Sequence, residues 1–424
     1  METPSPTTLA ATPAPAAPAE KTPPDAHYQV LIVGGGTAGL TVAARLRRLA
    51  DAPTVAVVEP SETHYYQPLW TLVGGGVFSK DVTERREADY IPPGAVWVRD
   101  AVIAFDPKAN TVATRGGRTL SYDALVVAPG IEIDWEAIPG LTETLGRNGV
   151  CSNYSYTHVE YTWEAMQALR PGARALFTQP STPIKCGGAP QKIMYLTADH
   201  LRRRGILDRV EVAMFNPGKA IFGVPEFRTT LEGVNERYGI PWHFGHELVA
   251  VRGEAREAVI RVTGGDGQPT ERVERFDMLH VVPPQRAPAF VAQSPLANDG
   301  GWVDVDRYTL QHVRHPNVFA LGDAAGTPNA KTGAAVRKQA PVVAENLMAY
   351  LRGDEGGAPA RYDGYSSCPL VTGYGRLVLA EFDYDNRPAP SFPFDTTKER
   401  RSMYALKKYG LPLMYWHGML RGRM

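Results

Sequence analysis

The sequence is poor in cysteine and has no excess of charge of either sign. It contains three cysteines in 424 residues, with 45 Lys and Arg against 45 Asp and Glu. Three cysteines cannot form the paired disulfides of a small secreted protein, because one is left over. Zero net charge argues against a broadly basic nucleic-acid-binding protein, and no run approaches the roughly 18 apolar residues that a transmembrane helix requires. The first interpretation of the thiols is therefore inert cysteines in a reducing cytosol.

The N-terminal segment, residues 1–27, lacks bulky apolar side chains. It contains seven Pro and seven Ala, a composition typical of extended, disordered chain. It has neither the apolar core of a signal peptide nor the arginines of a mitochondrial transit peptide, since the first arginine is Arg45. We predict a disordered tail on a protein of a bacterial-type cytosol. The remaining length is sufficient for two or three domains.

The first ordered element that the sequence predicts is a nucleotide-binding unit. The β-type run QVLIV leads into Gly34, Gly36 and Gly39, which match G-x-G-x-x-G, and a helical pattern and a second strand ending in Glu59 follow. In such a unit the glycines permit a tight turn, close approach to a pyrophosphate and helix–strand packing, while the helix N-terminus binds phosphate. The acid after the second strand accepts ribose hydroxyls. The pattern therefore predicts a bound dinucleotide.

Two later segments narrow the choice of dinucleotide. YDALVVAPG ends in Gly130, and NVFALGDAAG contains Gly322 and Asp323 before a helix that we expect to begin near Lys331. Together with the glycine unit, these segments resemble the flavoprotein superfamily that has two dinucleotide-binding domains. The resemblance implies FAD as the cofactor, with the Asp323 carboxylate bonded to its ribityl or phosphate region.

A second unit of this type is predicted to have lost its nucleotide. Its strand, residues 173–178, is followed by QPSTPIKCGGAPQK instead of the glycine motif, and the next strand ends in Asn216 rather than in an acid. Both requirements for NAD binding therefore fail. The loop instead places Cys186 beside Lys185 and before a predicted helix, an environment that lowers the pKa of a thiol. The alternative is a buried structural cysteine.

Several further motifs resemble one family. YYQPLWTLVGGG, TPIKCGGAPQKIMYL, AKTGAAV, CPLVTGYGRLVLAEFDY and residues 398–422 resemble the sulfide:quinone oxidoreductases, above all the branch shared by bacteria and mitochondria. The resemblance covers essentially everything from residue 28 onward. It implies that Cys186 and Cys368 are redox-active, and it adds Gln67 to the predicted cofactor contacts.

The same resemblance implies a mechanism. Hydrosulfide attacks the two cysteines, which are joined as a disulfide or through a bridging sulfur. Cys368 then becomes a persulfide, and Cys186 attacks the C(4a) carbon of FAD and delivers two electrons. The persulfide sulfur leaves to sulfide, sulfite or a low-molecular-weight thiol, and the electrons pass to a membrane quinone. Cys151 is either a third redox cysteine, as in another branch of the family, or a semi-buried bystander.

Other side chains are predicted to assist at the same site. Glu160 is a candidate general base near the sulfide channel, with a solvated helix charge as the alternative. Lys331 is a candidate for stabilising negative charge on the reduced flavin. No metal ligands are predicted. Aromatic candidates for the quinone site, for which core packing is the alternative, are Phe222, Phe227, Tyr374 and Phe382.

The C-terminal residues 398–424 carry seven basic side chains against one acidic one, so the rest of the neutral chain is acidic. Tyr, Trp, Met and Leu are interleaved with these charges. The composition is typical of an interfacial anchor. We predict two short amphipathic helices, separated at Gly410 and Pro412, that bind the membrane surface where a lipid-soluble quinone resides. The alternative is a helix docked on the core or at a dimer interface.

The predicted fold is α/β, with two Rossmann-like domains, the second without nucleotide, and a C-terminal amphipathic membrane-binding segment. Its predicted parts are a tail (1–27), the FAD domain in two halves (28–150 and 286–352), the second domain with Cys186 (151–285), and the C-terminal redox-cysteine and anchoring region (353–424). The predicted function is sulfide:quinone oxidoreduction on the cytoplasmic face of a bacterial membrane. The alternatives are a type II NADH:quinone dehydrogenase and a non-turnover sulfide sensor. Expected partners are hydrosulfide, quinone, a sulfur acceptor and the membrane surface, but no nucleic acid. The sequence leaves open whether the chain forms a homo-oligomer.

Overall fold

The computed structural model describes residues 25–264, 268–354 and 358–424, so most of the predicted tail lies outside the described residues. Strand β1 (Ala26–Val33) begins inside the range predicted as tail. Its start is held because the backbone N–H of Asp25 donates to Thr119 O (2.8 Å) and Ala26 pairs with Leu120. The folded chain therefore begins earlier than the prediction of a tail through residue 27.

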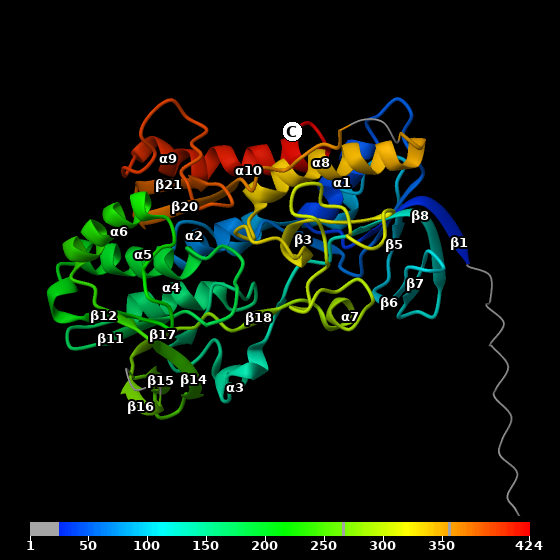
Figure 1. Ribbon diagram of the computed structural model, residues 1–424. Coiled ribbons are helices and arrows are strands. Elements are labelled where there is room, and N and C mark those ends of the chain that lie inside the picture. The colour runs from blue at the N-terminus through cyan, green and yellow to red at the C-terminus, as the bar shows by residue number, and fades with distance from the viewer. Residues whose placement is uncertain (1–24, 265–267, 355–357) are drawn as a thin grey trace, which may run out of the picture.

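The first domain is built on a seven-stranded sheet whose central strands are parallel and buried. The strand order is β5 (Val96–Val98), β2 (Val55–Val58), β1, β8 (Thr119–Val127), β7 (Thr111–Thr114) and β6 (Val102–Asp106), with β19 (Val318–Ala320) also paired to β8. Helices α1 (Thr37–Leu46) and α8 (Gly333–Arg352) pack against each other beside this sheet (Figure 1). Because β2, β1, β8 and β19 are parallel, their carboxyl ends meet at one edge, where nucleotides bind in such folds.

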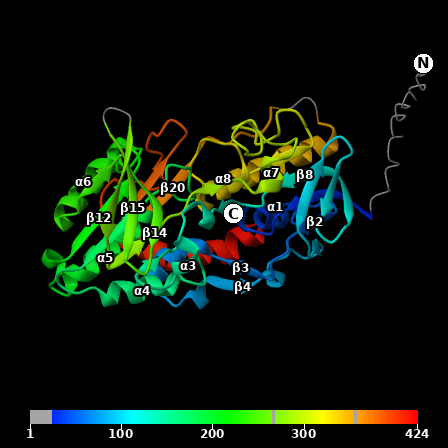
Figure 2. The ribbon, with the colours of Figure 1, turned by 90° about the horizontal axis from the view of Figure 1, so that it is seen from below.

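The second domain repeats this plan. Its parallel sheet has the order β10 (Val150–Cys151), β17 (Met278–His280), β11 (Arg174–Thr178), β12 (Glu211–Asn216) and β13 (Trp242–Phe244). Helices α4 (Val159–Ala168), α5 (Ala189–Arg203) and α6 (Pro225–Tyr238) belong to it, as does an antiparallel sheet of β14 (His246–Arg252), β15 (Glu257–Thr263) and β16 (Pro269–Arg275). Figure 2 shows the two domains side by side. The predicted α/β architecture is confirmed.

Short elements connect the two domains and cover them. They are β3 (Thr63–Tyr65), β4 (Glu84–Arg86), α2 (Trp70–Gly74), β9 (Glu132–Ile133), α3 (Leu141–Thr144), β18 (Gln285–Arg286) and α7 (Ala289–Ala292). Strands β20 (Ser366–Gly373) and β21 (Arg376–Phe382) then form an antiparallel hairpin that packs against α5. Strand β21 is buried on both of its faces after its first residue.

Residues 401–421, the C-terminal helix, form one helical run and not the two helices predicted. The run comprises α9 (Arg401–Ala405), a π-turn (Leu406–Gly410), α10 (Leu411–Leu413), a second π-turn (Met414–Gly418) and a final tight turn (Met419–Arg421). Gly410 has right-handed helical dihedrals, so it does not end the helix. Pro412 lacks an N–H, and the widened turns on either side accommodate it, since π-bulges shift the usual bonding pattern.

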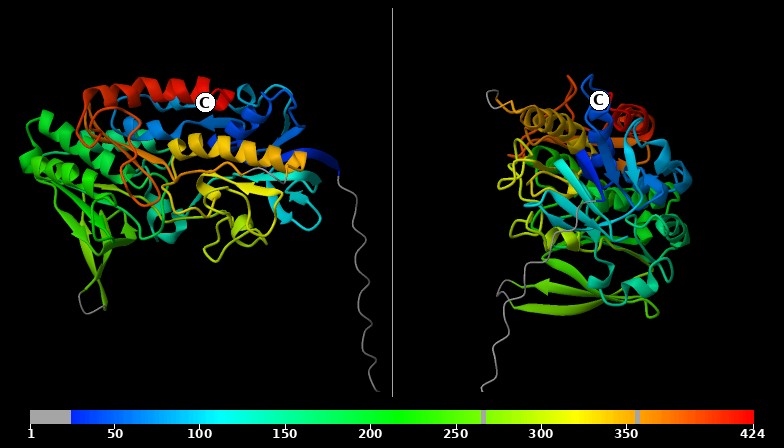
Figure 3. Two further views of the ribbon diagram at one scale, coloured as in Figure 1. Left: turned by 45° about the horizontal axis from the view of Figure 1, so that its top comes forward. Right: turned by 90° about the vertical axis from the view of Figure 1, so that its right-hand side faces the viewer.

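One face of the C-terminal helix is docked on the core, alongside α1 (Figure 3). Its buried side chains are Met403, Lys407, Tyr415, Trp416, Met419 and Leu420. The basic and aromatic residues Lys407 and Trp416, predicted to face lipid, therefore point inward, and the docked alternative describes this face. The opposite face leaves Tyr409 and Leu413 exposed. In the described part of the chain, no helix has the length and apolar character needed to cross a membrane.

Candidate active site

The glycine loop between β1 and α1 has the geometry of a phosphate-binding turn. Gly34 has φ +100°, and a Cβ there would lie 2.4 Å from Ala128 O. A Cβ on Gly39 would lie 1.9 Å from Gly34 O, so helix and strand pack too closely for any side chain. Gly36 faces open space and precedes α1 without a side-chain cap. The first amides of α1 are thus left for an anion.

The other predicted cofactor contacts lie at the same edge of the sheet. Glu59 follows β2, and its carboxylate accepts from the backbone N–H groups of Gly35 (2.7 Å) and Ser61 (2.8 Å). Gly130 follows β8 with φ +84° and open space around it. Gly322 and the half-buried Asp323 follow β19. Free helix amides, an acid positioned by the loop and a second carboxylate are the groups that bind phosphate and ribose hydroxyls, so these residues fit FAD.

Cys186 and Cys368 lie together beside this edge. Their Sγ atoms are 3.6 Å apart, although 182 positions separate them in the chain. Cys186 has φ +52°, and its backbone N–H donates to Lys331 O (2.9 Å). Cys368 lies in β20 and is 1 % exposed. A Cβ on Gly188 would lie 2.3 Å from Leu370 Cδ2, so this glycine allows the start of α5 to approach β20.

The cation beside Cys186 is Lys192 and not the adjacent Lys185. Lys192 Nζ lies 3.0 Å from Cys186 Sγ, whereas Lys185 Nζ donates to Gln67 Oε1 (2.5 Å). Gln67, predicted to touch the cofactor, thus holds Lys185. The chain turns at Cys186, which has a positive φ. Lys192 reaches back to the sulfur of Cys186 from the first turn of α5.

A second lysine reaches this cluster from the far end of the chain. Lys407 of the C-terminal helix is 3 % exposed, and its Nζ donates to Pro68 O (2.9 Å). Burial, together with the charge of Lys192, lowers the pKa of Lys407 to about 7, while Cys186 and Cys368 oppose that shift. Sequence reasoning missed both lysines, and Lys407 was assigned to the membrane face.

The two thiols have opposite titration behaviour. The hydrogen bond from Cys368 lowers the pKa of Cys186 well below its ordinary value, and the positive charges of Lys192 and Lys407 act in the same direction against the effect of burial. The same hydrogen bond, with burial, raises the pKa of Cys368 well above its ordinary value. In the reduced pair, Cys186 is therefore the thiolate and Cys368 the thiol that donates to it.

The C-terminal helix also contacts the glycine loop. Tyr415 OH is hydrogen-bonded to Thr37 Oγ1 (2.8 Å), at the start of α1, and to His64 Nε2 (2.5 Å). His64 Nδ1 in turn bonds to Glu87 Oε2 (3.0 Å), and both side chains are buried. The helix therefore contacts Pro68 through Lys407, whose charge acts on Cys186, and the start of α1 through Tyr415.

Lys331 and Glu160, the two predicted helpers, each bond to backbone groups of the protein. Lys331 Nζ donates to the carbonyls of Asp323 (2.7 Å) and Ala325 (3.0 Å), so it braces the Gly-Asp turn, and burial lowers its pKa to about 8. The helix after this turn begins at Gly333, two residues beyond the position expected. Glu160 Oε1 accepts from the backbone N–H of Lys80 (3.2 Å) and lines a surface pocket with Phe78.

The four aromatic residues predicted as candidates for a quinone site form two groups. Phe222 contacts both Phe227 and Phe382 edge to face, with ring centroids 6.3 and 5.9 Å apart. Tyr374 is separate and donates to Gly75 O (2.6 Å). Phe227 is fully buried, which favours core packing for that residue.

Cys151 lies in β10, inside the second domain. Its thiol is fully buried and points to Leu279 O at 3.6 Å, and burial raises its pKa to about 12. This environment favours the structural alternative over a redox role. We expect Cys151→Ser to keep sulfide-dependent flavin bleaching within about twofold of the unmodified rate, because Cys186 and Cys368 and their lysine neighbours are unchanged. A loss as large as that of a Cys186 variant, measured by stopped-flow absorbance, would make Cys151 a participant.

Comparison with known proteins agrees with these features. Residues 28–169 match the family model described as pyridine nucleotide-disulphide oxidoreductase. The chain is 45 % identical over 399 residues to the mitochondrial sulfide:quinone oxidoreductase of Dictyostelium discoideum, covering 93 % of this chain and 86 % of that protein. It is 43 % identical to the mouse mitochondrial protein of the same name, covering 93 % and 87 %. The chain belongs to the sulfide:quinone oxidoreductase family.

Structural comparison supports the same fold across nearly the whole chain. The sulfide:quinone oxidoreductase of Aquifex aeolicus superposes with a TM-score of 0.76 at 20 % identity, covering 94 % of this chain and 92 % of that one. Like the rest of its family, the chain is an FAD-dependent oxidoreductase, which confirms the predictions of family, enzyme and cofactor.

Proposed function

We propose that the chain oxidises hydrosulfide at the Cys186–Cys368 pair and passes the electrons through FAD to a quinone. The observation that carries the proposal is the 3.6 Å separation of the two sulfurs, beside the turn that carries Asp323. FAD, when bound, accepts two electrons from thiols and returns them to a quinone. The glycine loop, Glu59 and Asp323 would hold the FAD beside the cysteine pair.

The unequal pKa values of the thiols decide which sulfur hydrosulfide attacks. In a disulfide, the thiol of lower pKa is the better leaving group, and here that thiol is Cys186. Hydrosulfide therefore bonds to the sulfur of Cys368, the disulfide bond breaks, and its electron pair stays on Cys186 as a thiolate. The products are a Cys368 persulfide and a Cys186 thiolate stabilised by Lys192.

The outer persulfide sulfur then passes to an acceptor. A nucleophile such as sulfide, sulfite or a low-molecular-weight thiol bonds to that sulfur, and Cys368 leaves as the thiolate. Loss of two electrons from the two cysteine thiolates restores the disulfide. Each cycle therefore takes up one hydrosulfide, passes its sulfur atom to the acceptor and releases two electrons. Lys192 and Lys407 offset the negative charge that accumulates at each stage.

The C-terminal helix is proposed to face the membrane with its exposed side, on the cytoplasmic surface of a bacterial membrane. Tyr409 (59 % exposed) and Leu413 (61 %) are the most exposed large apolar side chains in the described part of the chain, and they are one helical turn apart. Such residues suit a monotopic contact with the bilayer interface. A lipid-soluble quinone would enter from that side.

The activity is tested by adding sulfide, and separately NADH, to the purified holoenzyme with a soluble quinone. We expect sulfide to bleach the flavin and reduce the quinone over many turnovers. NADH should leave the flavin oxidised, because the loop after β11 carries Cys186 and no glycine motif. Bleaching by NADH would instead favour a type II NADH dehydrogenase, and a single bleaching by sulfide without quinone turnover would favour a sensor.

A further inference from the structure

Helix α5 and strand β20 lie side by side and are joined at two distant points. At one point Cys186, just before α5, meets Cys368 near the start of β20. At the other, Asp199 in the last third of α5 meets Tyr374, the residue after β20. From the lengths of helix and strand between them, the two points are on the order of 15–20 Å apart.

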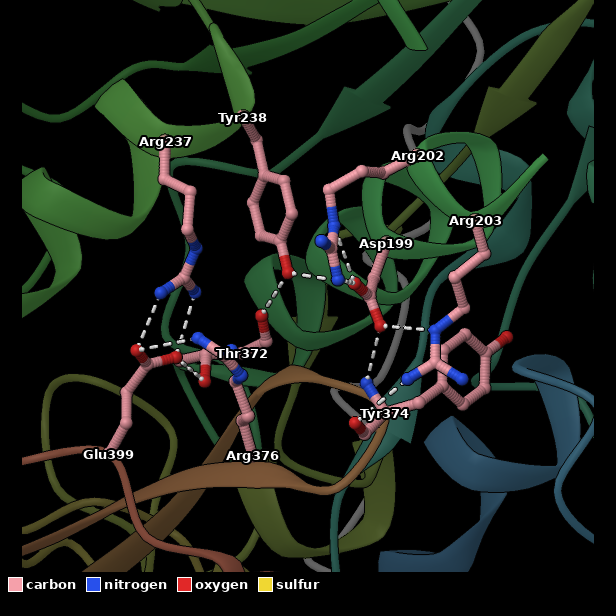
Figure 4. A network of polar contacts seen from close by, with 9 residues as sticks. All are labelled: Asp199, Arg202, Arg203, Arg237, Tyr238, Thr372, Tyr374, Arg376 and Glu399. Atoms are coloured by element: carbon pink, nitrogen blue, oxygen red, sulfur yellow. Dashed lines mark hydrogen bonds and ion pairs between the residues drawn. The ribbon is translucent and has the colours of Figure 1, made fainter. Parts of the chain in front are cut away.

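Asp199 is the centre of the second contact (Figure 4). Its side chain is only 3 % exposed. One carboxylate oxygen accepts from the backbone N–H of Tyr374 (2.9 Å) and from Arg203 Nε (3.0 Å). The other accepts from Arg202 Nη2 (2.7 Å) and Tyr238 OH (3.3 Å). A single buried carboxylate therefore binds the helix that follows Cys186 to the hairpin that carries Cys368.

The surrounding groups hold the same turn of the hairpin. Tyr238 OH also lies 2.9 Å from Thr372 O. Its single proton is donated either to this carbonyl or to Asp199, depending on the rotation of the hydroxyl group. Arg203 Nη2 donates to Tyr374 O (3.1 Å). Gly373, with φ +157°, would place a Cβ 2.7 Å from Tyr238 OH, so the turn fits closely against the helix. Glu399, before the C-terminal helix, is paired with Arg237 (2.6 Å) and hydrogen-bonded to Thr372 in the same network.

During the proposed cycle the two cysteines are not always bonded to each other. When Cys368 carries the persulfide or both thiols are reduced, no covalent bond joins α5 to β20. A slide of β20 by one residue along its own axis would move Cys368 by roughly 3.3 Å relative to α5. The register of β20 on α5 must therefore be held by other contacts for the disulfide to form again.

We infer that Asp199 is a positioning residue that fixes the register of β20 on α5 and so keeps Cys186 and Cys368 within bonding reach while they are unbonded. The inference rests on the proposed two-cysteine function. Asp199 acts through its hydrogen bond with the backbone of Tyr374 and does not itself contact the sulfurs.

The test is the equilibrium between the cysteine pair and glutathione in the full-length holoenzyme. Cys186 and Cys368 lose two electrons to one glutathione disulfide. Their own disulfide forms, and one proton from Cys368 and one from solvent complete the two glutathione thiols. Anaerobic samples at a series of glutathione ratios are alkylated, and the fraction of disulfide is measured by mass spectrometry. Flavin absorbance in the same samples reports cofactor content. The variants are Asp199→Asn, Tyr238→Phe and, as a matched surface control, Asp208→Asn, whose carboxylate is 81 % exposed.

Asp199→Asn keeps the shape of the side chain but loses its charge and replaces one of its two acceptor oxygens with an NH₂ donor. We expect its equilibrium constant for disulfide formation to fall about tenfold, equivalent to a reduction potential about 30 mV higher. Tyr238→Phe should lower the constant by a smaller factor, and Asp208→Asn should leave it unchanged. A purely structural role would lower the melting temperature and flavin content without changing the constant.

An unchanged constant in Asp199→Asn, with the disulfide forming normally in the unmodified enzyme, would overturn the inference and leave the proposed function intact. If Asp199→Asn does not fold, Tyr238→Phe decides: a constant equal to that of the unmodified enzyme would overturn it. Failure of the unmodified enzyme to form the disulfide at any glutathione ratio would overturn the proposed two-cysteine function, and the inference with it.

Discussion

Cys186→Ser and Cys368→Ser are each expected to lower the rate of flavin bleaching by sulfide by at least about a thousandfold, because residues that act as one unit fail together. Serine cannot form the disulfide that hydrosulfide attacks, so neither the persulfide nor the Cys186 thiolate can be generated. For the same reason the double variant should be no slower than either single one. The measurement is anaerobic stopped-flow absorbance of the flavin after mixing with sulfide.

The control for this result is chemical reduction of the same variants. Dithionite should bleach the flavin of both serine variants fully, since Gly34, Glu59 and Asp323, which we expect to hold the cofactor, are unchanged. Bleaching by sulfide at the unmodified rate in either variant would show that electrons reach the flavin without the pair, and the two-thiol mechanism would be wrong.

Lys192→Met should move the titration of Cys186 to higher pH by roughly one to three units, the range that an opposite charge at this distance produces. Cys368 remains as the hydrogen-bond donor, but the cation 3.0 Å from Cys186 Sγ is lost. Because the pKa of Cys186 is depressed in the folded enzyme, removing a cause of the depression raises it. Less thiolate is then present at neutral pH, and Cys186 becomes a poorer leaving group.

The shift is measured by the rate of alkylation of Cys186 in the reduced enzyme as a function of pH, followed by mass spectrometry of the peptide. Lys219→Met, at an exposed position, should leave the profile where it is. The same profile in Lys192→Met as in the unmodified enzyme would mean that Lys192 does not set the pKa of Cys186 and that the hydrogen bond from Cys368 and the charge of Lys407 suffice.

The nucleotide-binding half of the site was predictable because its signal is local. Gly34, Gly36, Gly39 and Glu59 lie within one strand–helix–strand unit, where the backbone itself imposes their residue types. The pairing of Cys186 with Cys368 has no such signal, because 182 positions separate them. It followed from family resemblance, and the fold then brought the sulfurs together.

The electrostatics of the thiol pair could not be predicted in the same way. Lys185 was favoured because it adjoins Cys186, but its Nζ donates to Gln67 Oε1 instead. Lys192 approaches the sulfur from the first turn of α5, and only the tertiary structure reveals this. Lys407 and Trp416 belong to a segment whose composition suits a membrane, yet composition does not tell which face of a helix docks on the protein.

The contact between Tyr415 and Thr37 has a consequence for the biosynthesis of the enzyme. The two residues are 378 positions apart in the chain, and Lys407 reaches Pro68 across 339 positions. The ribosome makes the glycine loop among the first residues of the domain and its hydrogen-bond partner among the last. Contacts of such long range are late and slow to form, and until then the apolar surface beneath the C-terminal helix is uncovered. The contacts of the C-terminal helix with the cofactor-binding region are therefore completed only after translation has passed Tyr415. Until then the chain must be kept from aggregating.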